Sequence, residues 1–159
     1  MTRLIDAVAM DFDGVLTDGA FWWGPGEEEW KRLSFTDVMG VSLGTRAGLR
    51  FAIISGEDTP LIDRYGAKMK ITDLYKGCKD KRRALEDFAN RHGTDLGRIA
   101  YIGDDVNDLA ALAIAGLSAA PADAHPEVRR VVDRVLERKG GCGAVRELID
   151  GILVGSTAR

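Results

Sequence analysis

Short apolar runs that alternate with helical segments constrain the fold of this chain more than any other feature. Each run has the length of a buried strand, and helical spacing or helix-start signals follow it. Strands that alternate with helices form right-handed crossovers, which give a parallel sheet covered by helices on both faces. The sequence therefore predicts an α/β fold. The expected strands cover residues 4–10, 49–54, 71–75, 99–102 and 117–120, with a possible sixth at 132–136.

Start and stop signals mark several of the expected helices. Thr36 or Asp37 can cap a helix that Gly48 ends, and Thr59 with Pro60 opens the next one. These signals support the alternation of strands and helices. The expected helices cover about 37–47, 60–69, 80–91, 107–115, 124–131 and 144–153, and residues 155–159 are expected to fray.

The composition is that of a globular protein with one domain, residues 1–159. The chain is 45% hydrophobic and 30% charged, and 159 residues are enough for a core. A net charge of -3 argues against nucleic-acid binding, and no apolar run reaches the ~20 residues of a membrane span. Because Cys78 and Cys142 do not suggest a disulfide scaffold, and the first residues have a strand pattern rather than that of a signal peptide, we expect a cytoplasmic protein.

An aromatic segment, about 19–35, interrupts the alternation after the first strand. Two runs that contain Trp22, Trp23 and Trp30 flank a turn rich in glycine and proline. This pattern predicts a β-hairpin. Two interpretations stay open: the aromatic side chains cover the core, or the hairpin projects and its aromatic side chains form a subunit contact.

Polar residues gather where the expected strands end. Asp11 and Asp13 follow the first strand, and Ser55 follows the second. Because the carboxyl ends of parallel strands meet at one edge of the sheet, these groups can converge. Neighbouring acids are costly unless a cation or a proton offsets them, so we expect a metal beside Asp11 and Asp13. The other members of the set are Lys81, after the third strand, and Asp104, Asp105 and Asp108, after the fourth.

This set of residues resembles the signature of the haloacid dehalogenase superfamily over residues 11–148. Three motifs also resemble a narrower group, the phosphatases of 3-deoxy-2-keto sugar acid phosphates. That group acts on 3-deoxy-D-manno-octulosonate 8-phosphate (KDO 8-phosphate) or on nonulosonate 9-phosphates. The resemblance implies a Rossmann-like sheet with a hairpin insertion and no cap domain. The motifs are Gly-Asp-Asp-Val-Asn-Asp at 103–108, Ala-Asp-Ala-His-Pro at 122–126 and Gly-Gly-Cys-Gly-Ala-Val-Arg-Glu at 140–147.

The resemblance implies phosphate transfer by two acids with different roles. Asp11 is the expected nucleophile, because a carboxylate that attacks phosphorus splits the hydrolysis into two easier steps. Asp13 is the expected general acid and then general base. Its presence favours phosphate transfer over dehalogenation, since family members that dehalogenate lack this second acid.

A magnesium site is implied by the same resemblance. The expected ligands of Mg²⁺ are Asp11, the backbone carbonyl of Asp13, and Asp104, because Mg²⁺ takes hard oxygen ligands. Asp108 is expected to orient these ligands without binding the metal itself. Asp105 is open between the same supporting role and a helix cap.

A phosphate site is expected beside the metal. Ser55 and the amide of Gly56 can donate to the phosphoryl oxygens, and a lysine supplies fixed positive charge. Lys79 and Lys81 are rival candidates for that lysine. The spacing Gly-x-x-Asp-Lys at 77–81 resembles the family's pattern and favours Lys81.

Three residues are candidates for substrate selection. Glu57 stands where KDO 8-phosphate phosphatases typically have arginine. Lys68 lies near the end of the helix that follows, expected at 60–69. Both resemble the nonulosonate 9-phosphate branch, in which this glutamate contacts the substrate. Arg146 can pair with a substrate carboxylate, or it is a surface arginine of the last helix.

The chain has no segment that could form a cap domain, although a phosphoryl-transfer site gains from excluding water. The resemblance implies a homotetramer in which neighbouring subunits cover the site. The hairpin and the C-terminal segment 140–159 are the expected contacts, and we interpret the glycine-rich run at 140–143 as a flexible hinge.

The leading hypothesis is a Mg²⁺-dependent phosphatase of a 3-deoxy-2-keto sugar acid phosphate. A phosphatase or phosphomutase for another small sugar phosphate is an alternative, although the missing cap argues against a mutase. A non-enzymatic signalling module that accepts phosphate on Asp11, as receiver domains do, is a further alternative. Asp13 argues against it, because such a module needs no acid for a sugar leaving group.

Overall fold

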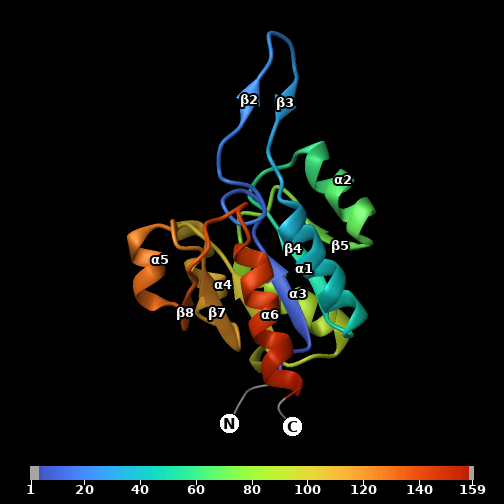
Figure 1. Cartoon of the computed structure of the whole chain (residues 1–159), viewed down its shortest axis with the longest axis vertical. Coiled ribbons are helices and arrows are strands. Elements are labelled where there is room, and N and C mark those ends of the chain that lie inside the picture. The colour runs from blue at the N-terminus through green and yellow to red at the C-terminus, as the bar shows by residue number, and fades with distance from the viewer. Residues whose placement is uncertain (1–3, 158–159) are drawn as a thin grey trace.

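The central element is a six-stranded parallel sheet with the strand order β5-β4-β1-β6-β7-β8 (Figure 1). A computed structural model describes residues 4–157. β1 and β6 lie in the middle of the sheet, and the expected α/β fold is confirmed. The strands are β1 (Ala7–Met10), β4 (Arg50–Ile54), β5 (Asp73–Tyr75), β6 (Ile99–Ile102), β7 (Leu117–Ala120) and β8 (Arg134–Val135).

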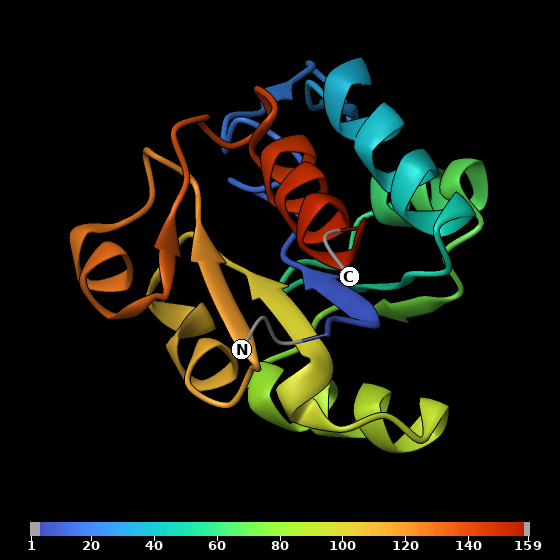
Figure 2. The ribbon, with the colours of Figure 1, turned by 60° about the horizontal axis from the view of Figure 1, so that its bottom comes forward.

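Helices cover both faces of the sheet (Figure 2). Alternate residues of β1 point to opposite faces, so Val8 and Met10 pack into one core while Ala7 and Ala9 pack into the other. The first core is closed by α1 (Phe35–Arg46), α2 (Pro60–Met69) and α6 (Ala144–Thr157). The second is closed by α3 (Lys81–His92), α4 (Leu109–Leu112) and α5 (Pro126–Val131). None of the helices in the described range is long and apolar enough to span a bilayer.

The expected hairpin is formed by β2 (Trp22–Trp23) and β3 (Glu29–Trp30), which pair antiparallel and project from the body of the molecule (Figure 1). Trp22, Trp23 and Trp30 are 57%, 73% and 53% exposed. The interpretation that these aromatic side chains cover the core is therefore wrong. Their role as a subunit contact stays a prediction.

The structure moves several helix boundaries. Ser34, rather than Thr36 or Asp37, caps α1 by accepting a hydrogen bond from the Thr36 amide. Asp37 points instead toward α6, where its carboxylate accepts hydrogen bonds from the amides of Gly143 (3.2 Å) and Arg146 (3.0 Å). The helix expected at 107–115 is shorter, because the 3-10 turn η2 (Val106–Asp108) precedes α4. Another 3-10 turn, η1 (Leu96–Arg98), precedes β6. The last helix runs to Thr157, so residues 155–157 are helical; residues 158–159 lie outside the described range.

The glycine-rich run at 140–143 is a packed turn rather than the expected hinge. Gly140 and Gly141 lie against the backbone of the loop that follows β1, and the Gly141 amide donates to the carbonyl of Val15 at 2.9 Å. A Cβ at Gly140 would collide with the carbonyl oxygen of Gly14. Glycine is therefore needed here for close approach, and the turn anchors the start of α6 beside the loop that carries the paired acids.

Candidate active site

Three neighbouring strands, β4, β1 and β6, deliver polar residues to one cavity of about 260 Å³ at the carboxyl edge of the sheet. Crossover connections place the start of α3 at the same edge, because the helix follows β5. The sequence-predicted acids and the serine therefore converge. The cavity is lined by Asp11, Asp13, Gly14, Gly19, Ser55, Gly56, Glu57, Asp104, Asp105 and Asn107.

A buried ion-pair cluster meets this cavity at Asp11. The Lys81 ammonium lies 2.9 Å from an oxygen of Asp11 and 2.8 Å from an oxygen of Asp108, and all three side chains are nearly inaccessible to solvent. The Tyr101 hydroxyl also donates to Asp108, at 2.7 Å. Lys79 is exposed, so the choice of Lys81 over Lys79 fits the structure. Burial raises the pKa of Asp11 well above its usual range and the charge of Asp108 adds to this, while Lys81 acts in the opposite direction.

The carboxylates of Asp11, Asp104 and Asp108 offer oxygens that all lie within 4.8 Å of one another. Burial, followed by the charges of Asp108 and Asp105, raises the pKa of Asp104 to about 7. A group of acids that repel one another so strongly is stabilised by a bound cation, and all of its donors are hard oxygens. The residues present therefore fit a divalent metal ion.

The loop after β1 is shaped for this cluster. Gly14 has φ +80°, which an L side chain rarely adopts, and a Cβ there would collide with the Asp104 carboxylate. The backbone amide of Phe12 donates to Asp11 at 2.7 Å. The second oxygen of Asp11 faces Lys81. These contacts fix the orientation of the Asp11 carboxylate.

The turn after β4 offers hydrogen-bond donors to the cavity. Ser55 is buried, and its hydroxyl oxygen accepts from the Glu57 amide at 3.1 Å, which leaves its proton free to donate to a ligand. Gly56 and Glu57 line the cavity as expected. Asn107, which the sequence analysis missed, lines it as well and brings its amide nitrogen close to Gly56.

Comparison with known proteins agrees with this geometry. A model of the haloacid dehalogenase-like hydrolase family matches residues 51–148. The chain belongs to this family. It is 39% identical over 149 residues to the 3-deoxy-D-manno-octulosonate 8-phosphate phosphatase of Haemophilus influenzae, covering 94% of this chain and 83% of that protein. It is 36% identical over 150 residues to the phosphatase of the same name from Escherichia coli K12, covering 94% and 80%.

Solved structures of such phosphatases have the same fold as this haloacid dehalogenase-like chain. The cobalt-bound enzyme of Haemophilus influenzae gives a TM-score of 0.94 at 37% identity, covering 98% of this chain and 91% of that one. The enzyme of Moraxella catarrhalis, in complex with magnesium, phosphate and KDO, gives 0.93 at 33% identity, covering 96% and 88%. This chain is therefore a phosphatase of the haloacid dehalogenase-like family, with a site for a divalent metal.

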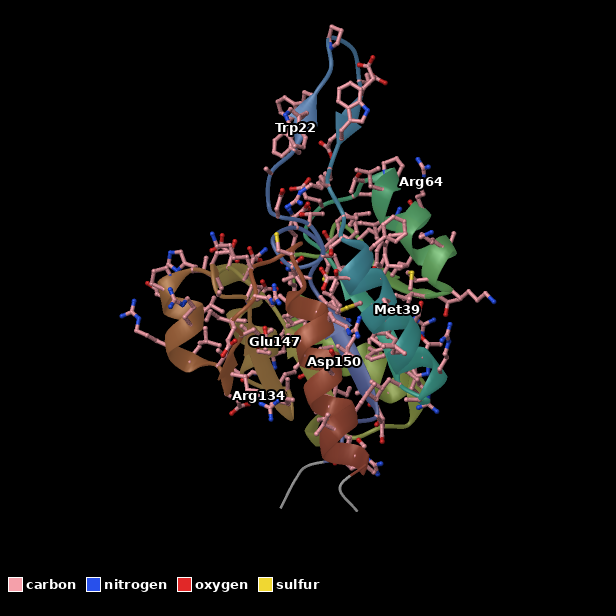
Figure 3. The ribbon with its side chains drawn as sticks, viewed as in Figure 1. Trp22, Met39, Arg64, Arg134, Glu147 and Asp150 are labelled. Carbon is pink, nitrogen blue, oxygen red and sulfur yellow. The ribbon has the colours of Figure 1, made fainter. Side chains whose placement is uncertain are left out.

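Not all predicted site residues of this family member reach the cavity. The Lys68 ammonium lies 5.9 Å from the centre of the Phe35 ring, outside the cavity lining. The Arg146 guanidinium bonds Asp150 at 2.8 and 2.9 Å, and Asp150 lies on α6, away from the hairpin (Figure 3). Contact of either residue with the substrate stays a prediction. Asp105 is exposed; it caps η2 and also lines the cavity, so both of its open roles stay compatible with the structure.

The sequence analysis missed Lys31, which contacts Asp13, the expected general acid. Its ammonium lies 2.8 and 3.0 Å from the two carboxylate oxygens of Asp13. Burial alone would lower the pKa of Lys31, but the contacts with Asp13 and Glu29 outweigh burial and raise it. The sequence offers no signal for this residue, because Lys31 follows three glutamates at 27–29 and precedes Arg32 in a charged part of the hairpin segment.

Proposed function

We propose that the chain is a Mg²⁺-dependent phosphomonoesterase that hydrolyses KDO 8-phosphate through an aspartyl-phosphate on Asp11. One observation carries the proposal: Asp11, held by Lys81, lines a cavity that Asp13 and Asp104 also line. The names of the relatives support KDO 8-phosphate as the substrate.

In the first step an oxygen of Asp11 attacks phosphorus, and the bond between phosphorus and the sugar oxygen breaks. Lys81 and the Ser55 hydroxyl offer positive charge and a hydrogen bond to the transferring phosphoryl group, which carries negative charge throughout. The departing oxygen is a strong base. Asp13 lines the same cavity and gives a proton to this departing oxygen.

In the second step water attacks the phosphorus of the aspartyl-phosphate. Asp13, now a carboxylate, takes a proton from this water, so inorganic phosphate leaves and Asp11 is regenerated. Each acid returns to its starting state. The cycle consumes one water and releases one sugar acid and one phosphate.

The charge of the cavity supports the metal requirement. Five of the lining residues are acids, and two buried lysines, Lys81 and Lys31, lie beside them. A phosphate dianion would be repelled by such a site. Asp11, Asp104 and the backbone carbonyl of Asp13 would hold Mg²⁺, with Asp108 in support. The bound ion would offset the negative charge of nucleophile and substrate.

A nonulosonate 9-phosphate is a second candidate substrate, because Glu57 lines the cavity beside Ser55. There it can accept hydrogen bonds from hydroxyls of a sugar. Both substrates carry the same chemical groups at the reacting end. The choice between them therefore depends on contacts made away from phosphorus.

A phosphate-release assay with Mg²⁺ tests the proposal. The substrates are KDO 8-phosphate, N-acetylneuraminate 9-phosphate, glucose 6-phosphate and p-nitrophenyl phosphate. We expect the highest kcat/KM on KDO 8-phosphate. Highest activity on the 9-phosphate would favour the second candidate, and equal kcat/KM on all four would remove the sugar-acid specificity. Stoichiometric phosphorylation without turnover would favour a signalling module.

A further inference from the structure

We infer that Lys31, at the base of the hairpin, is a positioning residue that orients the Asp13 carboxylate for proton transfer. Its ammonium contacts both oxygens of Asp13, at 2.8 and 3.0 Å. The Lys31 side chain is only 5% exposed, whereas that of Asp13 is 30% exposed. The lysine is therefore packed behind the acid, and the acid still reaches the cavity.

Further contacts hold Lys31 in this place. Its ammonium lies 3.4 Å from Glu29 and 5.8 Å from the centre of the Phe12 ring, which belongs to the same loop as Asp13. The Thr17 hydroxyl also donates a hydrogen bond to Asp13, with 3.4 Å between the two oxygens. Asp13 is thus bounded by residues of two segments, so its carboxylate has few alternative orientations.

The segment that carries Lys31 is fixed to the loop after β1 at two further points. Leu33 pairs with Thr17 in an isolated antiparallel bridge, and Arg32 donates to Asp18 at 3.1 Å. Because these contacts are made by the two residues that follow Lys31, this end of its backbone is held against the loop. The base of the hairpin is therefore part of the active-site framework, although its tip projects into solvent.

The contact has a direct consequence for the proposed chemistry, on which this inference rests. When Asp13 gives its proton to the departing oxygen, it becomes a carboxylate beside the Lys31 ammonium. The attraction between the two groups grows as the proton leaves, so it stabilises the transition state more than the ground state. One carboxylate oxygen of Asp13 accepts from both Lys31 and Thr17, whereas the other accepts from Lys31 alone and keeps a second lone pair available for the proton.

The test uses two substrates that differ in their need for the acid. KDO 8-phosphate releases a strongly basic alkoxide, whereas p-nitrophenyl phosphate releases a weakly basic phenolate that needs little protonation. The value of kcat/KM depends on the steps up to departure of the alkoxide or phenolate. The later hydrolysis of the aspartyl-phosphate therefore does not affect it. We expect Lys31→Met to lower kcat/KM on KDO 8-phosphate at least about tenfold more than on p-nitrophenyl phosphate.

Three further variants make the result interpretable. Asp13→Asn removes the acid and should show the same substrate difference, at larger size. Arg32→Gln removes a neighbouring contact to the same loop but leaves Asp13 paired with Lys31, so any loss of kcat/KM should be equal on the two substrates. Lys31→Arg keeps the charge and should restore part of the loss on KDO 8-phosphate.

Three outcomes would overturn the inference. In the first, Asp13→Asn shows the difference between substrates, but Lys31→Met lowers kcat/KM equally on both or on neither. Lys31 then does not orient the acid, and the proposed function stands. A difference as large in Arg32→Gln would assign the effect to the loop as a whole. If Asp13→Asn shows no difference, the acid role of Asp13 fails, and the inference fails with it.

Discussion

At the scale of single residues, the site is defined by an imbalance of buried charge. Asp11 and Asp108 share one cation, Lys81, and Asp104 lies beside them. Three acids with one lysine cannot all stay ionised without a further positive charge. In the metal-free protein a proton offsets part of this charge, because burial and the neighbouring carboxylates raise the pKa of both Asp11 and Asp104. We expect a metal ion and this proton to compete.

This competition predicts how stabilisation by Mg²⁺ depends on pH. The pKa of Asp104 is about 7 when folded and metal-free, above its unfolded value, so this group favours the folded state at low pH and loses that contribution as pH rises through about 7. Mg²⁺ replaces the proton. The rise in melting temperature on adding Mg²⁺ should therefore be larger at about pH 8 than at about pH 5.5.

An Asp105→Asn variant provides the control. Asp105 is one of the charges that raise the pKa of Asp104, so its removal should move the midpoint of the pH effect to lower pH. The same Mg²⁺ stabilisation at both pH values in the unsubstituted protein would contradict this account.

At the scale of elements, a single buried carboxylate joins two helices that lie far apart in the sequence. Asp37, in the first turn of α1, accepts hydrogen bonds from the amides of Gly143 and Arg146 at the start of α6. It therefore caps a helix other than its own, and a carboxylate at a helix N-terminus also meets a favourable dipole. We expect Asp37 to fix α6 against α1.

Substituting Asp37→Ala should lower the free energy of unfolding by about 1–2 kcal/mol, because two amides at the start of α6 lose their acceptor. Urea unfolding measures the change. Asp150→Ala is the matched control: it removes a half-exposed i,i+4 pair with Arg146 and should cost only about 0.5 kcal/mol. An equal loss in both variants would show that the cap contributes nothing specific.

Some elements could be predicted from the sequence because their signals are local. Apolar runs and capping residues placed the central strands and the start of α2, and the strand ends placed Asp11, Ser55 and Asp104 in one cavity. The pairing of Lys31 with Asp13 and that of Asp37 with α6 depend on contacts between distant segments. No local pattern marks such pairs. The same limit explains why the run at 140–143 was interpreted as a hinge rather than a packed turn.

At the scale of the whole molecule, the exposed hairpin predicts assembly. Phe21, Trp22, Trp23 and Trp30 are all at least half exposed on a projecting ribbon (Figure 3). Large exposed aromatic side chains are typical of interfaces. Since the structure shows no cap domain among residues 4–157, we expect neighbouring subunits to shield the cavity.

Sedimentation velocity should show a species of about four times the mass of one chain, as in a closed symmetric tetramer. A Trp22→Ser, Trp23→Ser double variant should shift the distribution toward smaller species, because it removes apolar contact area without touching the core. Arg64→Ser, on the exposed face of α2, serves as control. A monomer at working concentration would contradict the proposed shielding by neighbouring subunits.

Asp11→Asn tests whether Asp11 forms the bond to phosphorus. Phosphate release from KDO 8-phosphate is compared between the unsubstituted protein and Asp11→Asn, at saturating Mg²⁺, after circular dichroism has shown that the variant is folded. The amide keeps the shape of the side chain but is a poor nucleophile, so the account predicts a loss of kcat on the order of 10³-fold or more. A variant that retains kcat within about tenfold of the unsubstituted protein would contradict it.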